Sequence, residues 1–257
     1  GYLELRKQGV RVGYLPAGSD GRGMYFYGEG LESIYSDENM YWVGYGQNGG
    51  VGTVWGGNPA PSAGNPTYRD VAKAEENHYS APALFSDAEA DVWLWDYLSA
   101  GVDGWDQRDF EVELNGVRKD HRTAIVKVKL LGGTKSGVAD EHHAVVWLNG
   151  TQIGEEVWSG EEWRTVEQVV DQALLVEGAN TVTVKAVLGG EVPYSLVYVE
   201  DIEVNYARYY RAKEDELRVR GDGHPVVTIS GFTSPRIAVV DVGTAAAALA
   251  GRGVRGE

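Results

Sequence analysis

Residues 142–154, HHAVVWLNGTQIG, decide the fold of this chain. Apolar and polar side chains alternate on both sides of Asn149-Gly150, which is the period-two pattern of β-strands. Asparagine followed by glycine accepts the two positive φ angles that a tight two-residue hairpin turn requires. The stretch therefore predicts a β-hairpin whose strands cover residues 142–150 and 151–158.

Further strands are predicted on both sides of this hairpin. Segments of the same alternating character are residues 109–114, 122–132, 163–170, 180–189 and 195–210. Turn residues separate them about every ten positions, which is typical of an all-β sandwich. We expect an antiparallel β-sandwich of the jelly-roll, galactose-binding-like kind, with one short helical turn near residues 173–180.

The two ends of the chain have a different character. Short alternating segments, broken by glycines, run from residue 3 to residue 45. Glycine, proline and asparagine dominate residues 47–77, so we expect a long loop there. We predict three parts: residues 1–104, an N-terminal β region with this loop packed on the sandwich; residues 105–212, the jelly roll; and residues 213–257, a small β appendage and tail.

Composition excludes several classes of function. The chain has no cysteine, which rules out disulfides, zinc–thiolate sites and a cysteine nucleophile within it. Its 38 acidic and 23 basic residues leave a formal net charge of −15, which repels phosphate backbones and anionic lipids. Apolar runs fall short of the ~18 residues that span a bilayer. We therefore expect neither nucleic-acid binding nor membrane insertion.

Aromatic residues are the most informative candidates for ligand contact. Tryptophan (8) and tyrosine (15) far outnumber phenylalanine (4), and their rings can stack on sugars or pack in the core. As a strand, residues 91–101 would place Trp93, Trp95 and Tyr97 on one face. We expect Trp55, in the glycine-rich loop, to be the most exposed ring. The predicted ligand-binding residues are Tyr45, Trp55, Trp93, Trp95 and Tyr97.

A calcium site is one interpretation of the acidic residues Asp87, Glu89 and Asp91. Carboxylates at positions i, i+2 and i+4 of a turn-rich stretch can wrap oxygen ligands around calcium. The stretch lacks the central glycine and closing glutamate of an EF-hand loop, so a solvated turn is the alternative.

Catalytic motifs are missing from the sequence. It contains no Gly-x-Ser-x-Gly elbow, no His-Glu-x-x-His, no P-loop and no dinucleotide fingerprint. His142 and His143 are neighbours on a predicted strand, so their side chains point to opposite faces and cannot readily chelate one ion. The many acidic residues leave a carboxylate pair for glycoside hydrolysis open, because only geometry selects such a pair.

Five segments together resemble a known family. They are FYGEGLESIYSDENMYWVGYG, ENHYSAPALFSDAEADVWLWDYLSAG, DEHHAVVWLNGTQIGEEVWSGEEWRTVEQVVDQALLVEGANTVTV, VYVEDIEVNYARYYRAKEDELRV and ISGFTSPRIAVVDV. In this order they resemble the region that precedes the peptidase domain in large secreted proteins of the gingipain-type cysteine peptidase group. The resemblance spans roughly residues 22–242.

The resemblance implies a β-sandwich accessory region with a jelly-roll element, secretion or cell-surface placement, and a multidomain parent. In that group the peptidase domain carries a His–Cys dyad. This chain matches none of the peptidase motifs, so no catalytic residue carries over. After VVDV the family pattern would continue with an Asp-Pro-rich link, whereas this chain has GTAAAALAGRGVRGE.

Three functions are consistent with these observations. The main hypothesis is a non-catalytic, extracellular or cell-surface accessory module that binds polysaccharide. The first alternative is a structural or assembly subunit that contacts another extracellular protein chain through residues 47–66 and 244–257. The second alternative is a glycoside hydrolase with two catalytic carboxylates.

Overall fold

The computed structural model describes residues 2–17, 23–28, 30, 38–46, 53–55, 67–87, 89–224, 226–234, 237, 240–241 and 248–250. Its contacts divide the chain into two compact units. The terminal unit combines Gly1–Pro61 with Phe232–Glu257, and the sandwich unit is Ser62–Gly231. The predicted jelly-roll range 105–212 lies inside the sandwich unit, which also includes strands from before residue 105.

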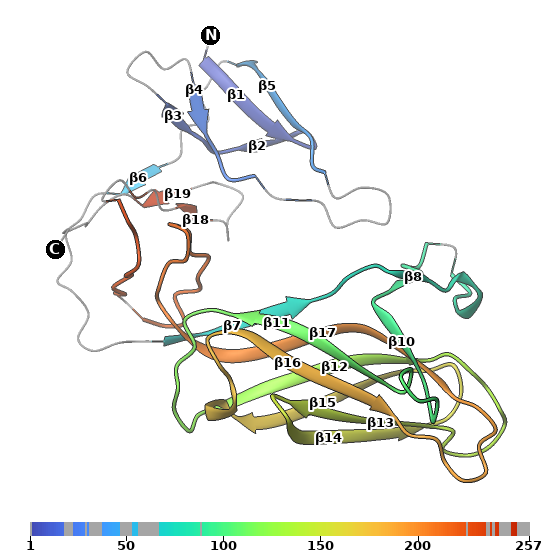
Figure 1. The fold of residues 1–257 in the computed structure, drawn as a ribbon. Helices are drawn as coiled ribbons and strands as arrows, with labels where there is room; N and C mark the ends of the chain where they lie inside the picture. Colours follow the sequence, from blue (N-terminus) through green and yellow to red (C-terminus); the bar gives the residue numbers. More distant parts are fainter. Residues whose placement is uncertain are drawn as a thin grey trace. The chain divides into compact units, whose positions relative to one another are not determined.

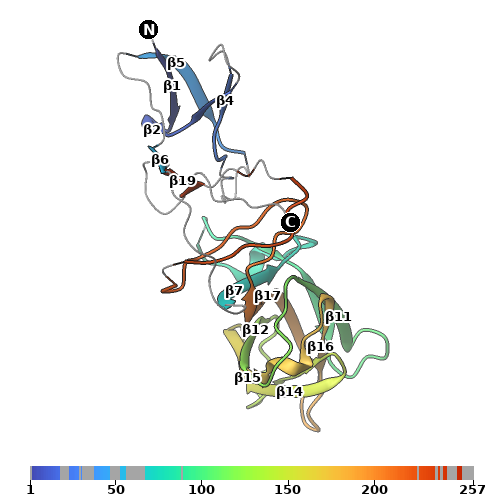
Figure 2. The same cartoon turned by 90° about the vertical axis from the view of Figure 1, so that its left-hand side faces the viewer.

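The sandwich unit consists of two antiparallel sheets, as the sequence predicts (Figure 1). The five-stranded sheet has the order β10-β17-β12-β15, and β7 also pairs with β17. The four-stranded sheet has the order β11-β16-β13-β14. Figure 2 shows the two layers side by side. The strands are β7 (Thr67–Ala74), β10 (Asp96–Ser99), β11 (Gln107–Leu114), β12 (Thr123–Gly132), β13 (His142–Leu148), β14 (Thr151–Trp158), β15 (Trp163–Asp171), β16 (Gly178–Ala186) and β17 (Leu196–Tyr209).

Alternating side chains of both sheets form one core between the layers. On β12, Ala124, Val126, Val128 and Leu130 are fully buried, while the residues between them are partly exposed. Strands of the facing sheet contribute buried residues in the same alternating manner. Burial of each such aliphatic side chain stabilises the fold by about 1.5 to 3 kcal/mol. The period-two pattern of the sequence thus becomes the inner face of the sandwich.

The predicted hairpin turn is confirmed. Asn149 and Gly150 have φ angles of 48° and 81°, and Leu148 pairs with Thr151 across the turn. The side chain of Asn149 also donates to the carbonyl oxygen of Leu174 at 2.9 Å and accepts from the amide of Thr181 at 2.9 Å. This turn is therefore anchored to the neighbouring chain as well as closing the hairpin.

The predicted long loop at residues 47–77 is wrong in part. It contains β6 (Thr53–Trp55) and β7, an eight-residue strand that pairs with β17. Sequence analysis missed β7 because its inward side includes Asp70 beside Tyr68 and Ala72, which hides the apolar alternation. Asp70 is satisfied by an ion pair of 2.6 Å with Arg208 on β17, a contact between residues far apart in sequence.

Short elements complete the sandwich unit. They are β8 (Tyr79–Ser80), which pairs with β9 (Trp93–Leu94), and the 3-10 helices η1 (Pro82–Leu84) and η2 (Gln172–Leu174). Of the helical turn expected near 173–180, only the start is helical: η2 ends at Leu174, and β16 begins at Gly178. The Asp171 side chain caps η2 by accepting from the amide of Ala173. Among the described residues, no helix has the length and apolar character that a membrane crossing requires.

The terminal unit is built from small sheets. One has the order β2-β1-β5, a second pairs β3 with β4, and a third has the order β18-β19-β6. Leu5 and Tyr14 are its buried apolar residues in the described part. The strands not yet given are β1 (Tyr2–Lys7), β2 (Val10–Val12), β3 (Leu15–Ala17), β4 (Gly23–Tyr25), β5 (Tyr41–Gly46), β18 (Val240–Asp241) and β19 (Ala248–Ala250).

Candidate functional site

The five aromatic residues predicted to bind a ligand are distributed over both units. Tyr45 lies on β5 of the terminal unit, and its side chain is 84% exposed. Trp55 ends β6 in the same unit, but its side chain lies outside the described residues. Trp93, Trp95 and Tyr97 belong to the sandwich unit. Of the five predicted residues, only Trp93, Trp95 and Tyr97 are therefore close in sequence and in the same unit.

The expected common face of Trp93, Trp95 and Tyr97 is not formed. Trp95 is only 8% exposed and packs edge-on against Phe110 in the core, with ring centroids 4.7 Å apart. The strand is interrupted at this residue, because β9 pairs with β8 whereas β10 pairs with β17. The change of partner turns the Trp95 ring inward, so it presents no face to a ligand.

Tyr97 instead belongs to an aromatic patch on the outer face of the five-stranded sheet. It is paired in register with Tyr198, and the next pair, Leu98 with Val197, is fully buried. Because side chains alternate along a strand, Tyr97 and Tyr198 must point away from the core. We call the rings of Tyr79, Tyr97, Trp105 and Tyr198 the Tyr97 patch.

The rings of the Tyr97 patch are in mutual contact. Tyr97 stacks on Trp105, with ring centroids 5.7 Å apart and an interplanar angle of 21°. Tyr79 meets Tyr97 edge-on at 5.0 Å, and Tyr198 lies 6.1 Å from Tyr97. Trp105 remains 46% exposed and Tyr79 39% exposed. The rings of the patch therefore hold one another in place by contact, while Trp105 and Tyr79 keep ring surface exposed to solvent.

A charged pair borders the patch. The guanidinium of Arg108 lies 5.0 Å from the ring centroid of Trp105, and its Nε atom is 3.2 Å from the carboxylate of Asp96. Arg108 also donates to the carbonyl oxygen of Gly104 at 2.8 Å. Flat apolar rings beside a fixed donor and a fixed acceptor are suited to a ligand with C–H faces and hydroxyl groups.

The remaining tryptophans of the described residues range from exposed to buried, with Trp147 between the two. Trp93 is exposed, but in the β8–β9 pair it lies opposite Ser80, whereas Tyr79 lies opposite Leu94. Its ring therefore points to the other side of this ribbon from Tyr79. In the described part of the chain, Trp42 and Trp163 are exposed as well, while Trp158 is buried.

Two of the three carboxylates predicted to hold calcium at Asp87, Glu89 and Asp91 have local hydrogen-bond partners in the structure. Asp87 accepts a hydrogen bond from the main-chain amide of Glu89 at 2.9 Å, and Asp91 accepts from the amide of Trp93 at 3.0 Å. The described residues contain no group of three His, Cys, Asp or Glu side chains placed to hold a metal ion. The carboxylates of Asp87 and Asp91 therefore take part in local turns, and calcium binding by this stretch stays a prediction.

One carboxyl group has the environment that an acid catalyst requires. Burial raises the pKa of Glu200 on β17 to about 7, with the charges of Glu75, Asp201 and Asp91 acting in the same direction and Lys129 against it. Its side chain is only 13% exposed, however, and lies 3.8 Å from the ammonium of Lys129. A glycosidase acid must also reach the scissile bond and face a second carboxylate, so the hydrolase alternative stays a prediction.

Three buried residues have the spacing of a Ser-His-acid arrangement. The Oγ atom of Ser195 lies 2.8 Å from Nδ1 of His142, and Nε2 of His142 lies 3.1 Å from Glu141. All three side chains are at most 1% exposed. Burial lowers the pKa of His142 and favours its neutral form. Without access to solvent these residues cannot meet a substrate, so they link β13 to the loop before β17.

Sequence reasoning missed most of the Tyr97 patch. Tyr79, Trp105 and Tyr198 come from three separate segments, and none was among the predicted ligand contacts. The sequence gives only local signs that these rings are exposed. Trp105 follows the turn sequence VDG at 102–104, and Tyr198 lies at an outward position of the strand predicted at 195–210. Which rings would meet depended on strand pairing.

The chain is similar to known proteins in its fold and not in a recognised sequence family. No protein-family model and no curated protein matches it. A solved structure of dimeric latent PorU from Porphyromonas gingivalis matches with a TM-score of 0.62 and 13% identity, over 99% of this chain and 24% of that one. This chain therefore spans about a quarter of the length of that protein. At this identity the likeness shows a shared fold, and the family resemblance stays a proposal.

Weaker likenesses involve carbohydrate-active proteins. The CBM36-1 domain of a multidomain xylanase from the hindgut metagenome of Trinervitermes trinervoides matches with a TM-score of 0.31 and 8% identity, over 53% of this chain and 96% of that one. A β-porphyranase from Bacteroides plebeius matches with a TM-score of 0.34 and 14% identity, over 81% of this chain and 30% of that one.

Proposed function

We propose that the chain is a non-catalytic, extracellular accessory module that binds polysaccharide through the Tyr97 patch. The supporting observation is the exposed ring of Trp105, held against Tyr97 and bordered by Arg108 and Asp96. Tryptophan faces stack on the C–H faces of sugar rings, and the charged pair can exchange hydrogen bonds with hydroxyl groups. Trp105 lies in the turn between β10 and β11, and hydrogen bonds of its main chain with Ser99 and Val102 hold that turn against the sheet.

Affinity electrophoresis and pull-down on insoluble glycans test this proposal. We expect the intact chain to be retained by at least one glycan, and Trp105→Ala to weaken retention roughly fivefold or more, as the loss of about 1 kcal/mol of ring contact implies. Trp163→Ala is the matched control, because Trp163 is an exposed tryptophan outside the patch. Trp93→Ala tests separately whether the exposed ring of Trp93, which lies outside the patch, contributes to retention.

The polysaccharide proposal fails on either of two results. One is a lack of retention on every glycan of a broad panel, with each protein shown to be folded by circular dichroism. The other is equal weakening by Trp105→Ala and Trp163→Ala, which would mean that any exposed tryptophan adheres to the matrix.

A second candidate function is assembly with another protein chain. The observation that favours it is β5 of the terminal unit, where Trp42 is 64% exposed and Tyr45 84% exposed on opposite faces of one strand. Large exposed apolar surface commonly marks a protein contact. Concentration-dependent association in analytical ultracentrifugation, abolished by Tyr45→Lys and accompanied by no glycan affinity, would favour assembly over the polysaccharide proposal.

A further inference from the structure

A cavity at the other end of the five-stranded sheet is separate from the Tyr97 patch. Its volume is about 450 Å³, within the usual range of small-molecule sites. It lies where β7 and β12 begin and β17 ends, whereas the patch lies at the start of β17. It is lined by Thr67, Tyr68, Arg69, His121, Arg122, Thr123, Ala207 and Asp222.

Arg69 contributes positive charge and hydrogen-bond donors to the lining of this cavity. Its guanidinium donates to the carbonyl oxygen of Thr123 at 2.7 Å and to that of Asn205 at 3.3 Å. No carboxylate of the described residues forms an ion pair with it within 4.0 Å. A guanidinium has five N–H donors, so the carbonyls hold the group in place and leave donors for a ligand.

A second guanidinium lies near the first. Arg122 lines the same cavity as Arg69. Burial lowers the pKa of Arg69, the charge of Asp222 acts against this, and the charge of Arg122 lowers it further, which is the direction expected of repulsion between two cations. An anion between them would relieve that repulsion and the cost of partial burial. Arginine is also the side chain best suited to grip carboxylate or sulfate oxygens with paired donors.

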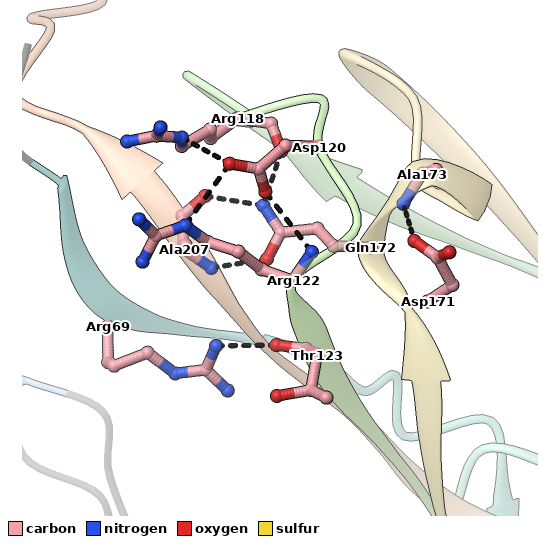
Figure 3. A network of polar contacts seen from close by, with 9 residues as sticks. All are labelled: Arg69, Arg118, Asp120, Arg122, Thr123, Asp171, Gln172, Ala173 and Ala207. Carbon is pink, nitrogen blue, oxygen red and sulfur yellow. Dashed lines mark hydrogen bonds and ion pairs between the residues drawn. The ribbon is translucent and has the colours of Figure 1, made fainter.

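Hydrogen bonds hold the wall around Arg122 in place. Asp120 accepts from the Nε atoms of both Arg118, at 2.5 Å, and Arg122, at 3.1 Å (Figure 3). The buried side chain of Gln172 donates to the carbonyl oxygens of Arg118 and Ala207, at 2.7 and 2.8 Å. These bonds tie the loop before β12 to β17 and so fix the position of this wall of the cavity.

The lining also offers groups for hydroxyls. Asp222 supplies an acceptor, and the threonines Thr67 and Thr123 supply hydroxyl groups. A ligand that carries one negative group and several hydroxyl groups would use both kinds of contact, whereas a strongly acidic peptide would meet the Asp222 carboxylate.

We propose that this cavity binds an acidic sugar, whose charged group lies between Arg69 and Arg122 and whose hydroxyl groups face Asp222. The inference rests on the proposed function, since it names the class of sugar that the module recognises at a second site. The charge of such a sugar can come from a carboxylate or a sulfate group, and both fit two guanidinium groups.

Isothermal titration calorimetry on the full chain tests the proposal. The probes are a galacturonate trimer and its methyl ester, which has the same sugars without the charge. We expect the acid to bind, more weakly as salt is added, and the ester to bind at least tenfold less tightly. Galactose 6-sulfate against galactose then tells whether sulfate serves in place of carboxylate.

Variants locate the binding. Arg69→Gln and Arg122→Gln should each weaken binding of the trimer roughly tenfold or more. Arg122 is half exposed and Asp120 keeps Arg118 as a partner, so this second variant preserves the fold even if Arg69→Gln does not. Arg164→Gln, which removes an exposed arginine paired with Glu162 on the same sheet, is the control and should change nothing.

Failure of this inference differs from failure of the proposed function. No binding of the acidic probes, equal binding of the ester, or unchanged binding by both arginine variants would overturn the inference. If Trp105→Ala abolishes binding of the trimer and the arginine variants do not, the sugar occupies the Tyr97 patch and only the inference falls. If the arginine variants alone matter, the cavity binds the sugar and the patch does not.

Discussion

At the residue scale, burial decides which aromatic rings can act. Trp95 and Trp105 are only ten positions apart, yet one packs in the core on Phe110 and the other is exposed on Tyr97. The difference follows from a change of strand partner at Trp95 rather than from the residue type. The tertiary structure also decides which polar residues can be buried. Gln172 is fully buried, and three hydrogen bonds satisfy its side-chain amide.

Glu200 should make stability depend on pH. Its folded pKa of about 7 lies above the ordinary value of 4.5, so the folded chain holds a proton that the unfolded chain releases. Its contribution is therefore complete below pH 4.5 and is lost as pH rises through 7. We expect Glu200→Gln to be more stable than the parent at pH 8 by ~1 to 3 kcal/mol and to lose this advantage toward pH 4.5.

Urea unfolding at several pH values measures this difference. Glu167→Gln is the control, because Glu167 is an exposed carboxylate on the same sheet, paired with Lys127. An advantage of Glu200→Gln that is the same at every pH would contradict the assignment of the raised pKa to Glu200.

At the element scale, the hairpin of β13 and β14 and the edge strand β7 illustrate two ways in which strands are specified. The hairpin is encoded locally, by alternation and by the left-handed residues Asn149 and Gly150. Strand β7 is specified by its partner β17, whose Arg208 neutralises the inward-facing Asp70. Local pattern therefore predicts the first and fails for the second.

The turn should be sensitive to a side chain at Gly150. Its φ of 81° is strained for other residues, so we expect Gly150→Ala to destabilise the sandwich unit by ~1 to 2 kcal/mol. Gly190→Ala is the matched control, because Gly190 has no positive φ and open space where a Cβ would lie. Thermal melts of the two variants should separate, and equal stability would show that the turn is not specified by backbone conformation.

At the scale of the whole molecule, the contacts divide the chain into two units whose cores differ greatly in size. The sandwich core contains residues from both sheets, whereas the described part of the terminal unit buries few apolar side chains. Stability scales with buried apolar area, so the two units should differ in stability.

Calorimetry should therefore show two unfolding transitions. We expect the terminal unit to unfold first, and Gly150→Ala to lower only the second transition temperature, because Gly150 belongs to the sandwich unit. A single transition, with calorimetric and van't Hoff enthalpies equal, would mean that the two units unfold as one cooperative structure.

The sequence by itself determined the all-β class, most strands of the sandwich and the hairpin turn. These features depend on alternation and turn chemistry, which act between residues that are close in the chain. It also determined the absence of cysteine chemistry and the strongly acidic charge.

Only the tertiary structure decided the candidate sites. The Tyr97 patch consists of rings from four segments. The cavity lined by Arg69 and Arg122 lies where β7 and β12 begin and β17 ends. Strand pairing sets which outward side chains become neighbours, and no local pattern records a partner that is a hundred residues away. For the same reason the sequence grouped Trp93, Trp95 and Tyr97 on one face, and the structure separated them.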